Sequence, residues 1–200
     1  MVQRRIVVVG GTGLIGTAVC SALRARGHEV LAVSRSTTPA IDVETDEGVV
    51  GYFAELGRVD AVITAFGSAP FRPLSQLGSE GIASALAGKA MEQIRVILGA
   101  IPFVSDGGSL TVTSGVLARE PVRAGTASAA ANGALEAFVR GAAAELPRGL
   151  RLNAVSPTVL AEGSALDLFP GFAPVSAVAV AHSYVRAVEN IDNGSVLIPA

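Results

Sequence analysis

The segment Ile6-Val7-Val8-Val9-Gly10-Gly11-Thr12-Gly13-Leu14-Ile15-Gly16 constrains the fold of this chain more than any other. Its β-branched run predicts a buried strand, and glycines spaced three apart then turn the chain abruptly into a helix. Glycine permits positive φ, close approach of the backbone to a ligand, and tight packing of helix on strand. We therefore expect this turn to bind the pyrophosphate of a dinucleotide at the helix N-terminus. The residues expected to contribute are Gly10, Thr12, Gly13, Leu14, Ile15 and Gly16.

The same region has a competing interpretation as a targeting segment. Arg4 and Arg5 precede an uncharged run from Ile6 to Leu23, as in a signal peptide or a short membrane anchor. Glycines and threonines interrupt this run, and no small-residue cleavage site ends it. The nucleotide-binding interpretation is therefore favoured.

The composition fits a single domain over residues 1–200 in the cytoplasm. Half of the residues are hydrophobic and 16% are charged, as expected when helices bury both faces of a sheet. A net charge of −2 provides no broad attraction to nucleic acid or to an anionic membrane. Cys20 is the only cysteine, so no intrachain disulfide can form. His28 and His182 stand alone, so no metal site is expected.

Apolar runs and segments of helical periodicity alternate along the whole chain. This alternation predicts an α/β fold, a single doubly wound parallel sheet of about seven strands with helices on both faces. Arg35 closes the second strand, and residues 36–40 are too few for a full crossover helix before the third, so the fold should be shortened there. The predicted strands are 6–9, 30–34, 41–43, 59–65, 108–115, 150–157 and 196–198, and the predicted helices are 14–27, 44–56, 79–101, 125–146 and 176–188.

The residues after the second strand bear on the cofactor. Arg35 stands about twenty residues beyond the glycines, where an acidic residue would hold the ribose hydroxyls of NAD and an arginine accommodates the 2′-phosphate of NADP. Ser34, Arg35 and Ser36 therefore favour NADP(H) over NAD(H), against the alternative that Arg35 is a solvated loop residue. Asp42 and Val43 are expected to lie beside the adenine.

Two polar residues stand where catalytic groups are expected. Ser114 lies at the end of the strand at 108–115, and active residues of doubly wound sheets collect at the carboxyl ends of strands. Lys89, the only lysine of the chain, lies at the edge of the inward-facing stripe of the helix at 79–101. It is either a functional lysine with a perturbed pKa or one that extends its amine to solvent.

The ordered motifs define a family resemblance over essentially the whole chain. Gly10-x-x-Gly13-x-x-Gly16, Thr113-Ser114-Gly115, Gly133-Ala134-Leu135-Glu136-Ala137-Phe138 and Leu152-Asn153-Ala154-Val155-Ser156-Pro157 resemble the short-chain dehydrogenase/reductase family. This resemblance implies a Rossmann fold, an NAD(P) cofactor, and homodimers or homotetramers built on the two long helices. The chain looks closest to a trimmed subgroup of similar length whose members lack the usual catalytic residues.

In that family a serine positions the substrate carbonyl, a Tyr-x-x-x-Lys pair transfers the proton and holds the ribose, and an asparagine often assists. Ser114 matches the serine, Ser128 and Asn132 take the tyrosine and lysine positions, and Lys89 falls at the asparagine. No Tyr-x-x-x-Lys occurs in the sequence. We therefore expect a rearranged site in which Lys89 and Ser114 act beside the nicotinamide, with Ser128 and Asn132 as hydrogen-bonding groups. The alternative is that Lys89 replaces the asparagine in a purely structural role.

The resemblance places two further segments at the cofactor, and both depart from the family pattern. Ala65-Phe66-Gly67 stands where members usually have Asn-Ala-Gly, and Thr158 follows Pro157 where a glycine is usual. Thr158 or its amide is expected to reach the carboxamide. The residues expected to contact the cofactor here are Ala65, Phe66, Gly67, Pro157, Thr158 and Val159.

The predicted function is an NADP(H)-dependent oxidoreductase that acts on a small apolar carbonyl or enoyl compound. Leu166, Leu168, Phe169 and Phe172, within the lid at 160–174, predict an apolar wall for the substrate pocket. Two alternatives stay open: a non-redox isomerase, lyase or cyclase that uses the same pocket, and a catalytically inactive NADP sensor.

Overall fold

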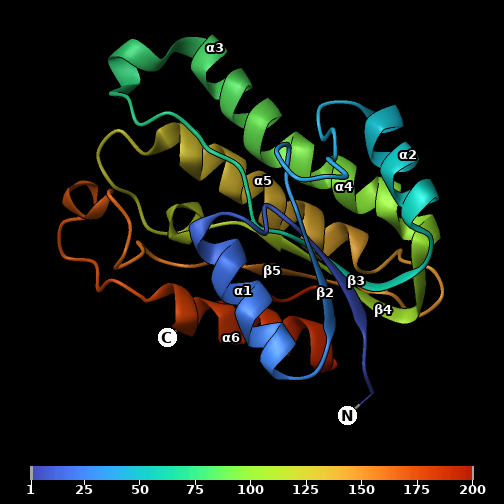
Figure 1. Ribbon diagram of the computed structural model, residues 1–200. Coiled ribbons are helices and arrows are strands. Elements are labelled where there is room, and N and C mark those ends of the chain that lie inside the picture. The colour runs from blue at the N-terminus through green and yellow to red at the C-terminus, as the bar shows by residue number, and fades with distance from the viewer. Residues whose placement is uncertain (1, 200) are drawn as a thin grey trace.

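The computed structural model describes residues 2–199 and has three layers, a central sheet between two groups of helices (Figure 1). Neighbouring strands are parallel throughout, in the order β2-β1-β3-β4-β5-β6. The predicted doubly wound α/β fold is therefore confirmed. The strands are β1 (Arg5–Val9), β2 (Glu29–Val33), β3 (Val59–Thr64), β4 (Val104–Thr113), β5 (Arg151–Val155) and β6 (Val196–Leu197).

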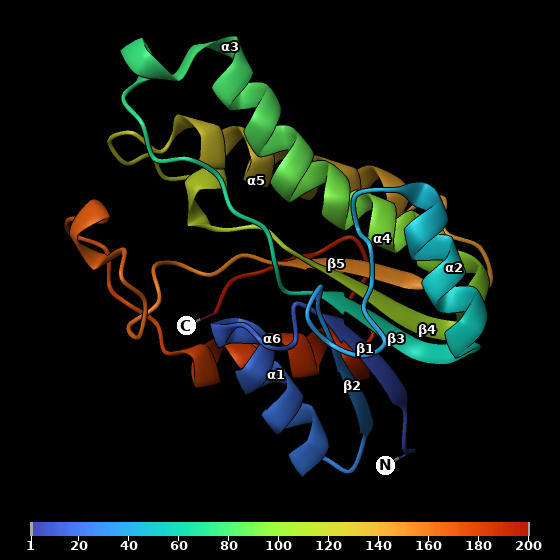
Figure 2. The same cartoon turned by 45° about the horizontal axis from the view of Figure 1, so that its top comes forward.

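Helices α1 and α6 cover one face of the sheet, and α2 to α5 cover the other (Figure 2). Their bounds are α1 (Leu14–Ala25), α2 (Asp46–Leu56), α3 (Leu74–Ala85), α4 (Glu92–Ala100), α5 (Thr126–Ala142) and α6 (Ala177–Glu189). Side chains of β1 alternate between the two cores: Val7 and Val9 pack under α2, α4 and α5, whereas Ile6 and Val8 pack under α1 and α6. Burial on both faces explains why this strand is a continuous apolar run. Within residues 2–199, no helix combines the length and the apolar character needed to cross a membrane.

Over residues 2–199 the sheet has six strands rather than the expected seven, because residues 41–43 do not join it. This segment leads into the N-terminus of α2, where Thr45 accepts a hydrogen bond from the Gly48 amide and donates one to Asp42 Oδ2. Arg95 of α4 donates to the Val43 carbonyl at 2.8 Å, which holds the segment against that helix. The shortening predicted between the second and third strands is thus complete, and β2 is an edge strand.

The helix predicted at 79–101 is a longer and less regular element. It begins at Leu74, contains Gly78 with a φ of 60°, and passes from α3 into α4 through a π-helical turn, η1 (Leu86–Met91). Single π-turns within α-helices are rare and often occur at functional sites. Lys89 lies in this turn, so its backbone geometry is not that of the regular helix used to predict its orientation.

Candidate functional site

The glycine turn after β1 has no room for a side chain at Gly10 or at Gly16. Gly10 has a φ of 84°, and a Cβ placed on Gly16 would lie 2.1 Å from the Gly10 carbonyl oxygen. Helix α1 then begins at Leu14 with no side-chain cap on Gly13. The first amides of a helix have no intrahelical acceptor, so those of Leu14, Ile15 and Gly16 are available to an anion. The geometry therefore suits a pyrophosphate, as the sequence predicts.

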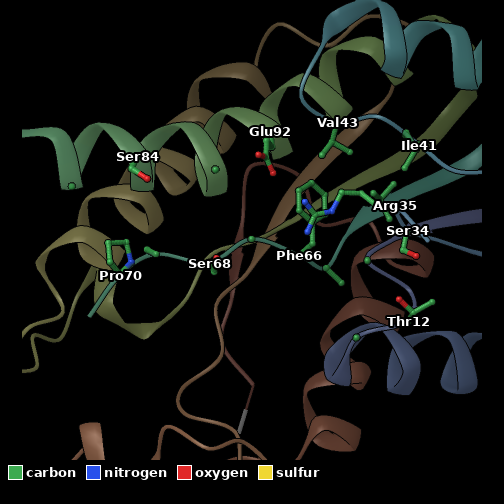
Figure 3. Close-up of a pocket in the computed structure, with 18 of the residues that line it drawn as sticks. Thr12, Ser34, Arg35, Ile41, Val43, Phe66, Ser68, Pro70, Ser84 and Glu92 are labelled. Carbon is green, nitrogen blue, oxygen red and sulfur yellow. The ribbon is translucent and has the colours of Figure 1, made fainter. Parts of the chain in front are cut away.

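A cavity of about 950 Å³ opens beside this turn at the carboxyl ends of β1, β2 and β3 (Figure 3). Arg35 extends its guanidinium into it from the end of β2, with Phe66 from the β3 side and Glu92 from α4 around the same space. Buried Ile41 and Val43 supply apolar walls. The cofactor residues predicted from the sequence that line it are Gly10, Thr12, Gly13, Ser34, Arg35, Val43, Ala65, Phe66 and Gly67.

Among the residues predicted at the cofactor after β2, Ser36 and Asp42 do not line this cavity. Leu14, Ile15 and Gly16 of the glycine turn and Pro157, Thr158 and Val159 do not line it either. The Ser36 hydroxyl lies 3.0 Å from that of Ser34. Asp42 is exposed, its Oδ1 accepts from the Glu44 amide at 2.8 Å, and its Oδ2 accepts from the Thr45 hydroxyl. These hydrogen bonds, led by the one from the Glu44 amide, lower the pKa of the Asp42 carboxyl. Asp42 thus serves the start of α2.

A smaller cavity of about 280 Å³ adjoins the first, and the two share Gly67, Ser68 and Ala69. The four residues predicted to be catalytic all line it: Lys89 from η1, Ser114 from the end of β4, and Ser128 and Asn132 from α5. Pro157 and Thr158 also line the smaller cavity. Val159, the next residue in the chain, is buried but does not line the cavity.

Aromatic rings border the smaller cavity on its lid side. Phe71 and Phe169 both line the cavity, and their ring centroids lie 6.0 Å apart. Phe172 packs edge-on against Phe169 at 5.6 Å. Leu166 and Leu168 are 40% and 41% exposed and do not line it. The apolar wall predicted for the lid therefore comes from Phe169 and from Phe71, which the sequence argument did not single out.

Among the described residues that line the smaller cavity, Lys89 is the one that carries a charge. Burial lowers the pKa of its amine from 10.5 to about 8. No hydrogen bond or ion pair joins this amine to the part of the chain that the structure describes, residues 2–199. Lys89 therefore presents to a small, partly apolar space an amine whose pKa is about 8.

Gln93 holds the turn that carries Lys89. Its side chain is fully buried, and its Nε2 donates to the carbonyls of Lys89 at 3.2 Å and Thr113 at 3.0 Å. Its Oε1 accepts from the Thr64 hydroxyl at 2.6 Å and the Thr113 amide at 2.8 Å. Gln93 thereby ties the π-turn to the ends of β3 and β4. A glutamine in an otherwise apolar helix stripe was the available sequence signal.

A buried carboxylate occupies the other side of Ser114. Glu136 Oε1 accepts hydrogen bonds from the hydroxyls of Ser114 at 2.9 Å and Ser156 at 3.0 Å, and from Arg119 at 2.7 Å. Ser128, Asn132 and Glu136 recur every four residues on one face of α5, which is the pattern that could have revealed Glu136. Because the Ser114 proton is directed to a carboxylate, its oxygen is left to act as an acceptor toward the cavity.

Two buried polar atoms of residues that line the smaller cavity, Asn132 Oδ1 and Thr158 Oγ1, have no hydrogen-bond partner in the described part of the chain. Buried polar atoms are nearly always satisfied, so unpaired ones at a cavity indicate a ligand or water. With the cradle at Gly10 and Gly16 and the free helix amides, they fit a bound dinucleotide. No group of three or more metal-ligating side chains is found within the described residues.

Comparison with known proteins shows which protein family this chain belongs to. The family model described as "Enoyl-(Acyl carrier protein) reductase" matches residues 11–195. This chain belongs to the short-chain dehydrogenase/reductase family. Among solved structures it is similar to the protein lin1944 from Listeria innocua, at 35% identity and a TM-score of 0.93 over 98% of both chains. It is also similar to a small-chain dehydrogenase in complex with NADPH, at 26% identity and a TM-score of 0.86 over 98% of this chain and 96% of the other.

Similarity to curated proteins is confined to a short segment. A bovine (Bos taurus) protein named "Epimerase family protein SDR39U1" is 41% identical over 70 residues. That segment is 35% of this chain and 22% of the bovine protein. A mouse (Mus musculus) protein of the same name is 63% identical over 35 residues, 18% of this chain and 12% of the mouse protein.

Proposed function

We propose that this protein is an NADP(H)-dependent oxidoreductase that acts on a small apolar carbonyl or enoyl compound. One observation carries the proposal: the cavity at the glycine turn and Arg35 adjoins the smaller cavity that holds Lys89, and Gly67, Ser68 and Ala69 line both. This adjacency suits a dinucleotide whose pyrophosphate binds at α1 and whose nicotinamide lies beside Lys89.

The choice of NADP(H) rests on Arg35. Its guanidinium points into the larger cavity from the end of β2, where an arginine accommodates a 2′-phosphate (Figure 3). Arginine also suits phosphate because its planar fork donates two parallel hydrogen bonds. The similar dehydrogenase crystallised with NADPH supports the same choice.

The polar groups of the smaller cavity have complementary roles in this proposal. Bound NADPH supplies a hydride to the substrate. Lys89, with a pKa of about 8, donates the proton that the substrate takes up with it. Ser114 donates to Glu136 and therefore accepts a hydrogen bond from the Lys89 ammonium or from a substrate hydroxyl. Asn132 Oδ1 and Thr158 Oγ1, which lack partners, bind the ribose hydroxyls and the carboxamide.

The test is NADPH oxidation, followed by absorbance across a panel of small aldehydes, ketones and enoyl compounds. With a substrate in hand, we expect Lys89→Met to lower kcat by about a hundredfold or more, the usual contribution of a general acid. The wild-type rate should fall above pH 8, because the donor form of Lys89 is lost as pH rises through its pKa. Wild-type kcat that is flat from pH 7 to 10, or full activity in Lys89→Met, contradicts the role of Lys89.

A second candidate, non-redox proton chemistry, is favoured by one observation. No tyrosine within residues 2–199 lines the smaller cavity, and Ser114 directs its proton to Glu136, so Lys89 is the titratable group left there for an isomerase, lyase or cyclase. Product formation without any change in NADPH absorbance, lost in Lys89→Ala, would favour this candidate. Tight NADPH binding with no reaction on any compound would favour the sensor.

We also propose that the protein is a homodimer or homotetramer in the cytoplasm, built on the two long helices. Leu74, Met91 and Leu98 are 69%, 48% and 53% exposed along α3, η1 and α4. A second copy would bury these apolar side chains. Light scattering coupled to size exclusion measures the mass, and a monomer at micromolar concentration contradicts this assembly.

A further inference from the structure

The larger cavity contains a carboxylate, Glu92, that neither the glycine turn nor the 2′-phosphate site explains. It extends from the first turn of α4 into the space around Arg35 and Phe66 (Figure 3). Within residues 2–199 it accepts no hydrogen bond. Burial and the nearby Glu44 raise the pKa of Glu92, whereas Arg35 and Arg95 oppose them. A partly buried acid without a hydrogen-bond donor is costly, and a ligand that supplies one offsets that cost.

The place of the nucleotide base follows from the walls of this cavity. If Arg35 holds a phosphate on the adenosine ribose, the base attached to that ribose lies close by. Ile41 and Val43, which follow Arg35 a few residues along the chain, are 1% and 6% exposed and line the cavity. Their apolar surfaces suit the face of a purine ring.

An adenine in that position carries an exocyclic amine that needs an acceptor. Asp42, between the two apolar residues, is the acceptor expected from the sequence, but both of its oxygens already accept hydrogen bonds from Glu44 and Thr45 outside the cavity. Glu92 lines the cavity, whereas Asp42 does not. Arg95, three residues further along α4, donates to the Val43 carbonyl at 2.8 Å, which fixes this part of α4 beside the apolar wall.

We propose that the Glu92 carboxylate accepts a hydrogen bond from the exocyclic amine of adenine, in place of Asp42, and so selects an adenine dinucleotide over its 6-oxo counterpart. The proposal rests on the proposed NADP(H) site. An oxo group at the same position would face the carboxylate with a second acceptor, so hypoxanthine would be disfavoured.

The probes are NADPH and its analogue in which hypoxanthine replaces adenine, titrated by nicotinamide fluorescence without substrate. We expect the wild-type protein to bind NADPH about tenfold to a hundredfold more tightly, the range for a hydrogen bond to a charged group. Glu92→Ala should bring the two affinities within about twofold of each other. Glu92→Gln should bind the analogue more tightly than the wild-type protein does, because a side-chain amide can donate to the oxo group.

Two control variants separate this role from general electrostatics. Glu80 lines the same cavity, so Glu80→Ala changes its charge equally and should keep the wild-type preference for NADPH. Asp42→Ala should also keep it, with the melting temperature monitored because Asp42 supports the start of α2. The role of Glu92 is overturned if folded Glu92→Ala keeps the full preference for NADPH over the analogue, or if Asp42→Ala loses that preference. If folded wild-type protein binds neither dinucleotide, the NADP(H) site itself is wrong.

Discussion

Replacing Gly16 by alanine tests the glycine turn directly. The added Cβ would lie 2.1 Å from the Gly10 carbonyl oxygen and 2.8 Å from the Gly11 Cα. Because these are backbone atoms, no change of side-chain rotamer relieves the overlap, and α1 must move away from β1. Overpacking of a core costs about 1–3 kcal/mol, and an overlap with backbone belongs at about the upper limit of that range. For a domain of this size, we expect the melting temperature to fall by about 6–12 °C.

The matched control is Gly51→Ala in α2. No heavy atom lies within 4 Å of a Cβ at Gly51, so this variant should be stabilised by about 0.5–1 kcal/mol through helix propensity. Scanning calorimetry with and without NADPH measures both effects, and the Gly16 variant should also lose the increase in melting temperature that NADPH produces in the wild-type protein. A Gly16→Ala protein that melts within 2 °C of the wild type and still gains stability from NADPH refutes the reasoning.

Three further predictions address other parts of the molecule. Arg35→Ala should weaken NADPH binding by about tenfold to a hundredfold and leave NADH unchanged in fluorescence titrations; equal losses for both would show that Arg35 does not read the 2′-phosphate. Glu136→Leu should lower the free energy of unfolding by about 2 kcal/mol in urea titrations, less than the loss expected for a fully buried ion pair, because the Arg119 side chain is one-third exposed. Adding Arg119→Met should restore part of the lost free energy, because it removes the cation that Glu136→Leu leaves without a partner. Glu189, whose pKa is lowered to about 2 by Arg26 and His28, should stabilise the wild-type protein over Glu189→Gln above about pH 4.5; that advantage should shrink as pH falls from 4.5 toward 2, and an advantage independent of pH would contradict it.

The course of the backbone could be predicted where the signal is local. The strand, the glycine turn and the following helix were read from consecutive residues, because buried parallel strands are apolar on both faces and the turn requires glycine. The strand predicted at 41–43 was wrong because its pairing depends on contacts with distant parts of the chain. A three-residue apolar segment cannot show whether it pairs with β2 or packs on a helix, and the Arg95 contact that decides this comes from 52 residues away.

The polar residues of the site were only partly predictable. Lys89, Ser114, Ser128 and Asn132 were located by motif spacing, and the structure brings them to one cavity. Glu136, Gln93 and Glu92 were missed, because helical periodicity shows at most which face of a helix a polar residue lies on, and not whether it contacts a strand end or lines a cavity. Burial and hydrogen-bond geometry supply that information.

The sequence by itself determined the alternation of strands and helices apart from residues 41–43, the glycine turn and the arginine after β2, since each depends on residues close together in the chain. Tertiary structure alone decided the chemistry of the smaller cavity. The proton of Ser114 is directed to Glu136 across 22 residues, and Gln93 joins the Lys89 turn to the ends of β3 and β4. Long-range packing sets the burial, hydrogen bonding and pKa of these groups, and these properties determine which of them can donate or accept a proton.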